Sequence, residues 1–468
     1  LLGLDNTYNI TDSGSLELNS PFNVATAVVD GTTYLFVAGV IDSGVSVFSV
    51  ANDGSLTNKY NVTDDGTLQL DGATSVTTAI VDGTTYLFVT GASDDGVSVF
   101  SVANDGTLTH KYSVTDNGAL QLKQAWSATT AIVDGTTYLF VAGRHDDGVS
   151  VFSVANDGSL TNKYNVTDSE TLQLDSAESI TTADVDGTTY LFVAGRNDGG
   201  VSVFSVANDG SLTNKYNVTD SETLQLSSAE SITTADVGGT TYLFVAGNYD
   251  HGVSVFSVAN NGALTNVYNV TDDGSLQLDG ASSVKTAEVH GTTYLFVAGA
   301  VDDGVSAFSV ANDGALTNLY NVTDSETLQL DSAESITTAN VDGTTYLFVA
   351  GRNDDGVSVF SIGRLNFTAL EDTQSDVDFY QLELDDDDGD TLTVTIAASA
   401  GSFAASSDSG VTIGGSGTAS LTLSGTAADI NTYLDTASNI QYTGELNANG
   451  DDAATFTINV DDGTTNPE

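Results

Sequence analysis

The chain has no cysteine and no methionine, and its 468 residues include only two prolines and one tryptophan. Without cysteine no disulfide can form, so folding does not depend on oxidation. Basic residues are also scarce, because ten lysines and arginines stand against 64 aspartates and glutamates, a formal net charge of −54. This balance excludes nucleic acid as a partner, since phosphate binding needs clustered basic side chains. No apolar run is long enough for membrane insertion.

What the chain has in abundance is repetition. A string that begins Gly-Thr-Thr-Tyr-Leu-Phe-Val recurs every 52 residues, without insertion or deletion, at Gly31, Gly83, Gly135, Gly187, Gly239, Gly291 and Gly343. A fixed period of this length marks an architecture in which each unit buries its apolar faces against its neighbours.

Each repeat reads as four short strands, which in the second copy fall at residues 75–81, 84–89, 97–102 and 108–114. The segments are rich in β-branched and aromatic residues, and Asp-Gly and Asn-Asp-Gly turns separate them. Four antiparallel strands repeated seven times predict an all-β seven-bladed β-propeller, with the small-residue strand innermost and the polar strand outermost. A parallel β-helix is the rival, but its coils are usually shorter and lack hairpin turns.

The two ends of the repeat region predict how the ring closes. Residues 6–11 match residues 58–63, the outer strand of a complete repeat, whereas the seventh copy stops after its third strand at residues 361–362. We therefore expect the N-terminal strand to complete the last blade, which would leave no open sheet edge.

The repeat motifs resemble a known family. Gly-Val-Ser-Val-Phe-Ser-Val, Asn-Asp-Gly-Ser-Leu-Thr and Asp-Gly-Thr-Thr-Tyr-Leu-Phe-Val-Ala-Gly are similar to the repeat of the lactonase-type β-propellers, such as 6-phosphogluconolactonase. The resemblance covers residues 1–362 and implies the propeller architecture. It implies lactone hydrolysis only as an alternative, because propellers host many unrelated functions.

Residues 363–468 have no such period and read as a β-sandwich with one short helix at residues 427–434. The matching pieces are Glu371-Asp372-Thr373 and residues 385–390, 423–431 and 460–463. Through them this segment resembles, over its whole length, the cadherin-like domains of bacterial repetitive adhesins. The resemblance implies further repeats in a longer protein, of which we expect the chain to be an internal or processed fragment. It also implies a calcium site, for which the acidic candidates are Glu371, Asp385, Asp387, Asp390 and Asp461; the alternative is a solvated acidic loop.

The positions at which the seven copies differ fall mostly on one face of the predicted ring. In the connection from outer to next inner strand, one position reads Phe22, Thr74, Trp126, Glu178, Glu230, Ser282 and Glu334. An arginine, histidine and aromatic rim facing an inner acidic arc is a candidate site for a polar ligand or carbohydrate. The candidates are Trp126, Arg144, His145, Arg196, Asn197, Tyr249, Arg352, Asn353, Asp184, Asp236 and Glu288. Free drift of surface turns among duplicates is the alternative.

From these features we expect a non-catalytic structural or adhesive protein at the cell surface, outside the cell. Its partners would be surface glycans or neighbouring copies of a larger assembly. The histidines do not converge on one site, and near-identical repeats leave little asymmetry for catalysis. A lactonase-type hydrolase and a carbohydrate-binding virion fibre component are the alternatives.

Overall fold

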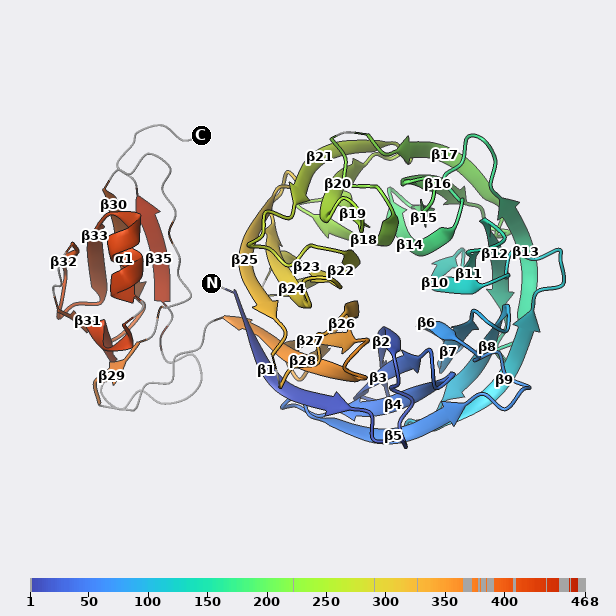
Figure 1. Ribbon diagram of the computed structural model, residues 1–468, viewed down its shortest axis with the longest axis horizontal. Helices are drawn as coiled ribbons and strands as arrows, with labels where there is room; N and C mark the ends of the chain where they lie inside the picture. The colour runs from blue at the N-terminus through green and yellow to red at the C-terminus, as the bar shows by residue number, and fades with distance from the viewer. Residues whose placement is uncertain are drawn as a thin grey trace. The chain divides into compact units, whose positions relative to one another are not determined.

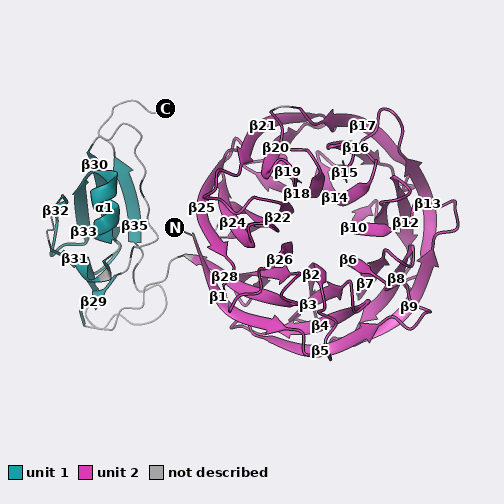
Figure 2. Ribbon diagram, in the orientation of Figure 1, with its two compact units in different colours: residues 1, 364–468 teal, residues 2–363 magenta. Residues whose placement is uncertain are grey.

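The computed structural model describes residues 2–221, 223–289, 291–325, 327–364, 373–377, 379, 384, 391–406, 410–434, 436–445, 454 and 456–461. The chain divides into two compact units, residues 2–363 and residues 364–468, the latter grouped with residue 1 (Figure 2). Among the described residues, no helix is long and apolar enough to cross a membrane.

The first unit is a ring of seven four-stranded antiparallel sheets around a central opening (Figure 1). In six of them the strands pair in chain order from the axis outward, as in a sheet built from consecutive hairpins. The predicted seven-bladed β-propeller is confirmed.

Blades 1 to 4 each take four consecutive strands. They are β2 (Pro21–Val29), β3 (Thr32–Gly39), β4 (Gly44–Val50) and β5 (Leu56–Thr63); β6 (Ala73–Val81), β7 (Thr84–Gly91), β8 (Gly96–Val102) and β9 (Leu108–Thr115); β10 (Ala125–Val133), β11 (Thr136–Gly143), β12 (Gly148–Val154) and β13 (Leu160–Thr167); β14 (Ala177–Val185), β15 (Thr188–Gly195), β16 (Gly200–Val206) and β17 (Leu212–Thr219).

Blades 5 to 7 continue the same order until the chain leaves the ring. They are β18 (Ala229–Val237), β19 (Thr240–Gly247), β20 (Gly252–Val258) and β21 (Leu264–Thr271); β22 (Ala281–Val289), β23 (Thr292–Gly299), β24 (Gly304–Val310) and β25 (Leu316–Thr323); β26 (Ala333–Val341), β27 (Thr344–Gly351) and β28 (Gly356–Arg364), with β1 (Leu2–Thr11) as the fourth strand.

Ring closure follows the sequence prediction, because β1 pairs with β28 as the outer strand of blade 7. The side-chain contacts repeat those of the other blades. Ser358 Oγ donates to Asn9 Oδ1 at 2.8 Å, as Ser46 Oγ donates to Asn61 Oδ1 at 2.9 Å within blade 1. The outer strand from one end of the chain therefore takes the place of the one missing at the other.

The cores lie between neighbouring blades, because both faces of the middle strands are apolar. Phe36 and Val45 of blade 1 pack with Leu87 and Val89 of blade 2 in one cluster of fully buried side chains. The hairpin between inner and second strands uses Asp-Gly pairs in which both residues have positive φ, as at Asp30 (49°) and Gly31 (78°). This turn has the twist that a two-residue hairpin requires.

One irregularity recurs at the same place in all seven inner strands. The second residue of each strand falls out of register with its neighbour, which is the pattern of a β-bulge. A bulge bends the strand and re-aims the side chain at that point. We call these residues the bulge ring: Phe22, Thr74, Trp126, Glu178, Glu230, Ser282 and Glu334. They mark the bulge end of the inner strands, and the Asp-Gly hairpins mark the opposite, turn end.

The second unit holds two small sheets and a helix. One sheet contains β29 (Ser375–Asp376), β34 (Ile440–Thr443) and β31 (Ser402–Ala405); the other contains β32 (Thr412–Gly414), β33 (Ser420–Gly425), β30 (Leu392–Ala398) and β35 (Phe456–Asp461). The predicted helix is confirmed as α1 (Ala427–Leu434), which Thr426 caps by accepting from the Asp429 N–H at 3.2 Å. A 3₁₀ turn, η1 (Ala437–Asn439), follows. The cadherin-like assignment stays a prediction.

Candidate functional site

The bulge ring brings two aromatic side chains of different blades into contact. The rings of Phe22 and Trp126 meet edge to face with centroids 5.2 Å apart and an interplanar angle of 78°. Two small members of the ring are bound to the backbone instead: Thr74 donates to the Ala125 carbonyl at 3.0 Å and Ser282 to the Ala333 carbonyl at 2.6 Å. Aromatic surface therefore covers one part of the ring, and the three glutamates occupy the rest.

Three arginines reach the bulge ring from the turns between second and third strands. Each Nε donates to a serine that stands two residues before a bulge residue, with distances of 3.2, 3.0 and 3.1 Å; the pairs are Arg144–Ser176, Arg196–Ser228 and Arg352–Ser20. In every pair the serine belongs to the next blade around the ring. These contacts hold the guanidinium groups over the bulge residues of the neighbouring blade.

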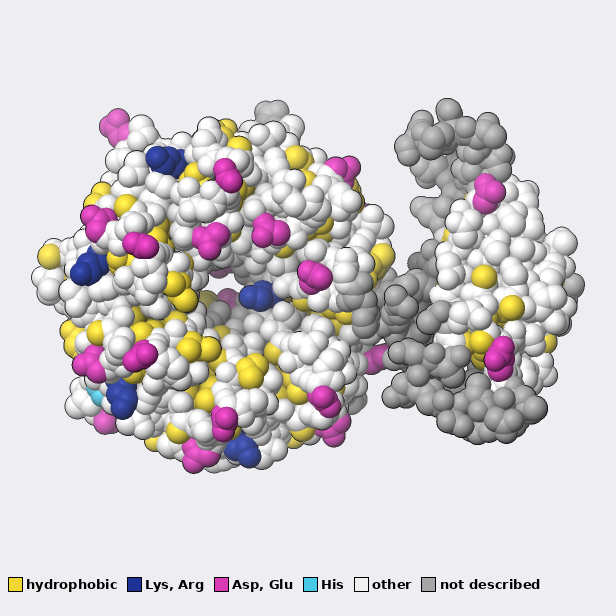
Figure 3. Space-filling view, turned by 180° about the vertical axis from the view of Figure 1, so that it is seen from behind, with side chains coloured by type: hydrophobic (Ala, Val, Ile, Leu, Met, Phe, Trp, Pro, Cys, Tyr) yellow, Lys and Arg dark blue, Asp and Glu magenta, His cyan; other side chains and the backbone are white. Residues whose placement is uncertain are grey.

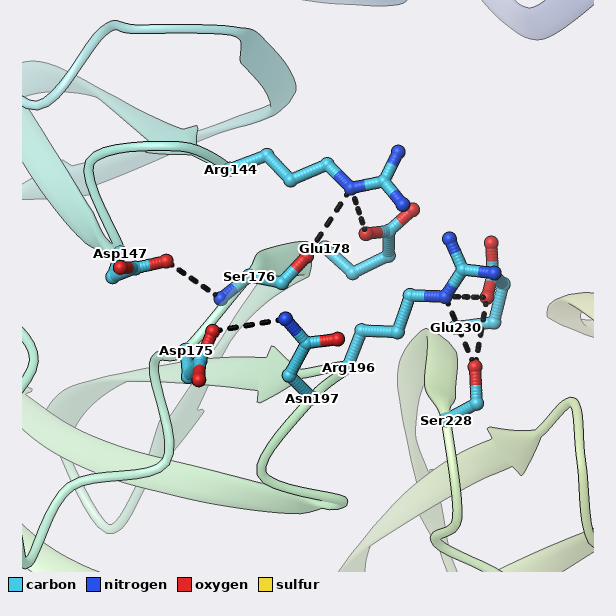
Figure 4. Close-up of polar contacts among 9 residues, drawn as sticks. All are labelled: Arg144, Asp147, Asp175, Ser176, Glu178, Arg196, Asn197, Ser228 and Glu230. Carbon is cyan, nitrogen blue, oxygen red and sulfur yellow. Dashed lines mark hydrogen bonds and ion pairs between the residues drawn. The ribbon is translucent and has the colours of Figure 1, made fainter.

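Two of the arginines form ion pairs with bulge glutamates (Figure 4). Arg144 Nε lies 3.1 Å from Glu178 Oε2, and Arg196 Nε lies 3.3 Å from Glu230 Oε2. Arg144 also stacks on Trp126, with Cζ 4.3 Å from the ring centroid, a favourable cation–π distance. The third arginine instead lies over an aromatic ring, since its Cζ is 5.7 Å from the Phe22 centroid. This mouth of the propeller thus joins charged and aromatic groups.

The Glu178 carboxyl is almost completely buried, with 1% of its side chain exposed. Burial, and next the charge of Glu230, raise the pKa of Glu178 to about 8, although Arg144 and Arg196 oppose the shift. Neither of its oxygens accepts a hydrogen bond from any described residue. Burial therefore outweighs the nearby Arg144 guanidinium, and the carboxyl keeps its proton, which it can donate to the Glu230 carboxylate.

Glu230 is the more accessible partner, with 14% of its side chain exposed. Burial raises its pKa, while Arg196, Arg144 and the hydrogen bond from Glu178 oppose that shift. The two carboxyls therefore titrate as a coupled pair, in which Glu178 is protonated at neutral pH. Such an unequal pair is an arrangement that enzymes use for acid–base chemistry.

A third bulge glutamate adds to the same cluster. Burial raises the pKa of Glu334 to about 7, opposed by Arg352 and reinforced by Glu230. Guanidinium groups stay charged in proteins, so three arginines face three glutamates, of which Glu178 is protonated at neutral pH. The cluster is therefore net positive on a chain whose formal charge is −54.

Part of the arginine donor capacity is unused. Arg144 and Arg196 bind their serine and glutamate partners through Nε, and neither Nη of these two residues forms a hydrogen bond with any described residue. Their side chains are 21% and 26% exposed. These N–H groups can donate to a carbonyl, carboxylate or phosphate oxygen of a ligand, because a guanidinium presents several donors in one plane.

The structure brings together Trp126, Arg144, Arg196 and Arg352 among the predicted site residues. The others on this face point elsewhere. His145, Asn197, Tyr249 and Asn353 are exposed, and the two asparagines donate to Asp175 and Asp331 of their own blades at 3.0 and 2.9 Å.

The predicted acidic arc of Asp184, Asp236 and Glu288 does not face this cluster. Each stands second from the end of its inner strand, six residues beyond the bulge, and pairs in register with a threonine near the start of the second strand, just after the hairpin. Six residues of strand span roughly 20 Å. The arc therefore lies at the turn end, and the rim at the bulge end.

Most of the predicted calcium ligands lie outside the described residues, namely Glu371, Asp385, Asp387 and Asp390. Asp461 is described, is exposed and ends β35. Within the described ranges, no group of three or more His, Cys, Asp or Glu side chains has metal-binding geometry. The calcium site stays a prediction.

The principal carboxylates were not among the predicted site residues, although a signal for them exists in the sequence. Arginine in a turn of blade 3 or 4 is accompanied by Ser-Ala-Glu at the start of the next inner strand, ending in Glu178 or Glu230. This association between an arginine in one repeat and a glutamate in the next becomes visible when each repeat is compared with the repeat that follows it. Phe22 follows the same spacing after Arg352 once the ring is closed.

No family model matches the chain, and no curated protein matches it. Solved structures do match. A provisionally named 6-phosphogluconolactonase of Bacteroides fragilis is 18% identical, with a TM-score of 0.53 over 68% of this chain and 87% of that one. The periplasmic gluconolactonase of Pseudomonas aeruginosa is 19% identical, with a TM-score of 0.52 over 69% and 97%. The fold is that of the lactonase-type propellers. At these identities the likeness concerns the fold alone.

These neighbours contradict the expectation that the chain is not an enzyme, because propellers of the same fold bear the names of hydrolases. The expectation rested on near-identical blades leaving no room for asymmetry. The structure shows why this reason fails: the bulge places one variable residue from every blade at the same mouth, so a few substitutions suffice to build an asymmetric cluster.

Proposed function

We propose that the propeller hydrolyses a lactone of the sugar-acid class at the bulge end. The observation that carries the proposal is the coupled pair Glu178 and Glu230 beside Arg144 and Arg196, in which burial keeps the proton on Glu178 while the arginines oppose the upward pKa shift of the more accessible Glu230. Lactone hydrolysis requires a base that activates water, a donor for the carbonyl oxygen and an acid for the leaving alkoxide. The names of the two fold neighbours support the same substrate class.

Each step has a residue suited to it. Glu230 accepts a proton from the attacking water, whose oxygen forms a bond to the lactone carbonyl carbon. The unused Nη groups of Arg144 and Arg196 donate to the carbonyl oxygen as it becomes negative. When the ring C–O bond breaks, Glu230 returns the proton to the leaving oxygen, so one water is consumed and one hydroxy acid released. Glu178 is a positioning residue, since its proton holds Glu230 in the ionised form.

The aromatic pair supports a sugar-derived ring as the ligand. Phe22 and Trp126 present part of their rings at the same mouth, and both are only partly buried. Rings of this kind stack on the C–H faces of sugars, while the neighbouring guanidinium groups bind carboxylate or phosphate oxygens. The site therefore fits an acidic sugar derivative better than a neutral apolar ester.

We expect the chain to hydrolyse δ-gluconolactone or its 6-phosphate faster than the spontaneous reaction, measured by alkali uptake at constant pH. Glu230→Gln should lower kcat/KM about a hundredfold, the usual contribution of a general base. Asp184→Asn, at the turn end of blade 4, is the matched control and should leave the rate unchanged. Trp126 is the only tryptophan, so its fluorescence reports lactone binding independently. No hydrolysis above background with either lactone, together with unchanged Trp126 emission, would refute the proposal.

A second role follows from the chain as a whole, and we propose it beside the first: display of the propeller within a larger extracellular surface protein. The net charge of −54, the absence of cysteine and a separate unit after residue 363 support this role. Surface glycans or neighbouring copies would be the partners, and calcium would bind the second unit.

We expect calcium to raise the unfolding temperature of the full chain, measured by calorimetry with magnesium as the control. An unchanged transition in calcium would remove the metal from this proposal.

A further inference from the structure

At the turn end, a side-chain contact fastens five of the blades to the next blade around the ring. An aspartate of the Asp-Gly hairpin accepts a hydrogen bond from an asparagine between the third and fourth strands of the following blade, at 2.7 to 3.0 Å. Five such clamps are present: Asp30–Asn104, Asp82–Asn156, Asp134–Asn208, Asp186–Asn260 and Asp342–Asn52. The clamp joins neighbouring blades at this end through one side-chain hydrogen bond.

Between blades 5 and 6 the clamp is missing, because Gly238 stands where the aspartate would be. Asn312, the asparagine of this junction, lies beside this position: its Oδ1 would be 2.9 Å from a Cβ added to Gly238. The turn itself remains in place, since Tyr242 Oη still donates to the Asn312 carbonyl at 2.8 Å, as equivalent tyrosines do elsewhere in the ring. Only the side-chain contact is lost.

A cavity of about 390 Å³ lies at this junction. The described residues that line it include Asp236, Glu288, Thr293 and Asn312, with Gly238 at its base. Its volume falls in the range of small-molecule sites and exceeds that of a single water many times over. The missing aspartate thus leaves room for a ligand of about monosaccharide size.

The charges that line this cavity favour a cation. Asp236 accepts a hydrogen bond from Thr241, but Glu288 forms none with Thr293 or with any other described residue, although the two pair in register. None of the described residues that line the cavity is basic. Two carboxylates beside an amide and a hydroxyl suit a protonated amine that also carries hydroxyl groups.

We propose that the cavity between blades 5 and 6 is a binding site for a small hydroxylated amine of the amino-sugar class. The ammonium group pairs with Asp236 and Glu288, and the hydroxyl groups bind Asn312 and Thr293. The site lies at the turn end, so it is separate from the cluster of arginines and glutamates at the bulge end. It does not depend on lactone hydrolysis.

The test uses glucosamine as the probe, with glucose and N-acetylglucosamine as uncharged controls, measured by saturation-transfer NMR and calorimetry on the full chain at pH 6. Gly238→Asp should restore the clamp and weaken glucosamine binding at least tenfold. The equivalent aspartates have φ of 48–50° and Gly238 has 58°, so the backbone accepts the change. Because this variant adds negative charge, unspecific attraction would strengthen binding, the opposite of the expected result. Glu288→Gln, at an exposed position, should also weaken it.

A reverse variant exploits the repeat. Asp186→Gly removes the clamp between blades 4 and 5, where Asp184 and Asp236 occupy the equivalent carboxylate positions. It should raise the stoichiometry of glucosamine from one to two, although it removes a negative charge. The proposal is wrong if Gly238→Asp binds glucosamine as tightly as the parent, if glucose binds equally well, or if the probe gives no signal and calcium alone binds.

Discussion

A chain that lacks residues 1–11 is expected to lose cooperative unfolding and to aggregate, because the ring can no longer close. Blade 7 would end in β28, whose edge would present unpaired backbone groups to other chains. The deletion also removes Leu4, which is 4% exposed within the last core cluster, and the hydrogen bond from the Asp12 N–H to the Asp355 carbonyl loses its anchoring strand. The loss of an entire strand with its core contacts should lower the free energy of unfolding by about 4 kcal/mol or more, which is beyond the usual effect of a single substitution.

Size-exclusion chromatography and thermal unfolding followed by circular dichroism measure this effect. A synthetic peptide of residues 2–11 added in trans is the control, since it supplies the same strand and should restore the transition in a concentration-dependent way. A truncated chain that stays monomeric and unfolds at the parent temperature would contradict closure by β1.

The fold could be predicted because the same strand and turn patterns occur in all seven copies of the repeat, so each pattern is supported by seven observations. The strands expected at residues 84–89 and 97–102 correspond to β7 (Thr84–Gly91) and β8 (Gly96–Val102). Closure was predictable from the match between residues 6–11 and the outer strands alone. The contacts confirm it at the level of side chains, since Ser358 and Asn9 repeat a bond found within other blades.

The site was predictable only in part, because its geometry depends on contacts between blades. Alignment of the copies identified Trp126 and the three arginines as unusual, but it treated each position separately. Glu178 gains its properties from Arg144 of the preceding blade and Glu230 of the following one. Asp184 lies at the turn end, opposite the arginine cluster, because it stands six residues beyond the bulge on the same strand. The sequence pattern does not reveal where that bulge lies.

The effect of Gly238 at the turn end also depends on a contact between blades. Gly238 in place of aspartate is visible in the aligned copies, yet its hairpin backbone differs little from the others. Its consequence lies 74 residues away in Asn312, which loses a partner. In a ring of near-identical blades, a substitution acts at the junction with the neighbouring blade, so function has to be sought between copies.

Glu178→Gln is expected to stabilise the protein in alkaline solution and to flatten the pH dependence of its unfolding free energy. The pKa of this carboxyl is raised by burial from an ordinary value of 4.5 to about 8 in the folded chain. The folded state therefore binds the proton more tightly than the unfolded state. Unfolding releases the proton between these two pKa values, so the unfolding free energy falls as the pH rises through this window and levels off above about 8.

Glutamine resembles the protonated form and cannot ionise, so the variant and the parent should be equally stable near pH 4. At pH 9 the variant should be more stable by on the order of 3 kcal/mol, a value below the full conversion of the shift because the carboxyl interacts with Glu230. Urea unfolding at a series of pH values measures the difference at constant ionic strength. Glu334 titrates in the same direction and remains in both proteins, so a residual slope is expected.

Asp53→Asn is the control of opposite sign. Hydrogen bonds from the Ser55 side chain and backbone lower the pKa of Asp53, so its stabilising effect is present above its ordinary range and is lost only toward acid. This variant should therefore be less stable than the parent at neutral and alkaline pH and match it only toward acid, where both side chains are uncharged. If Glu178→Gln instead destabilises the chain equally at every pH, the buried carboxyl is ionised throughout and paired with Arg144. The proton-sharing pair, and with it the assignment of Glu230 as the base, would then be wrong.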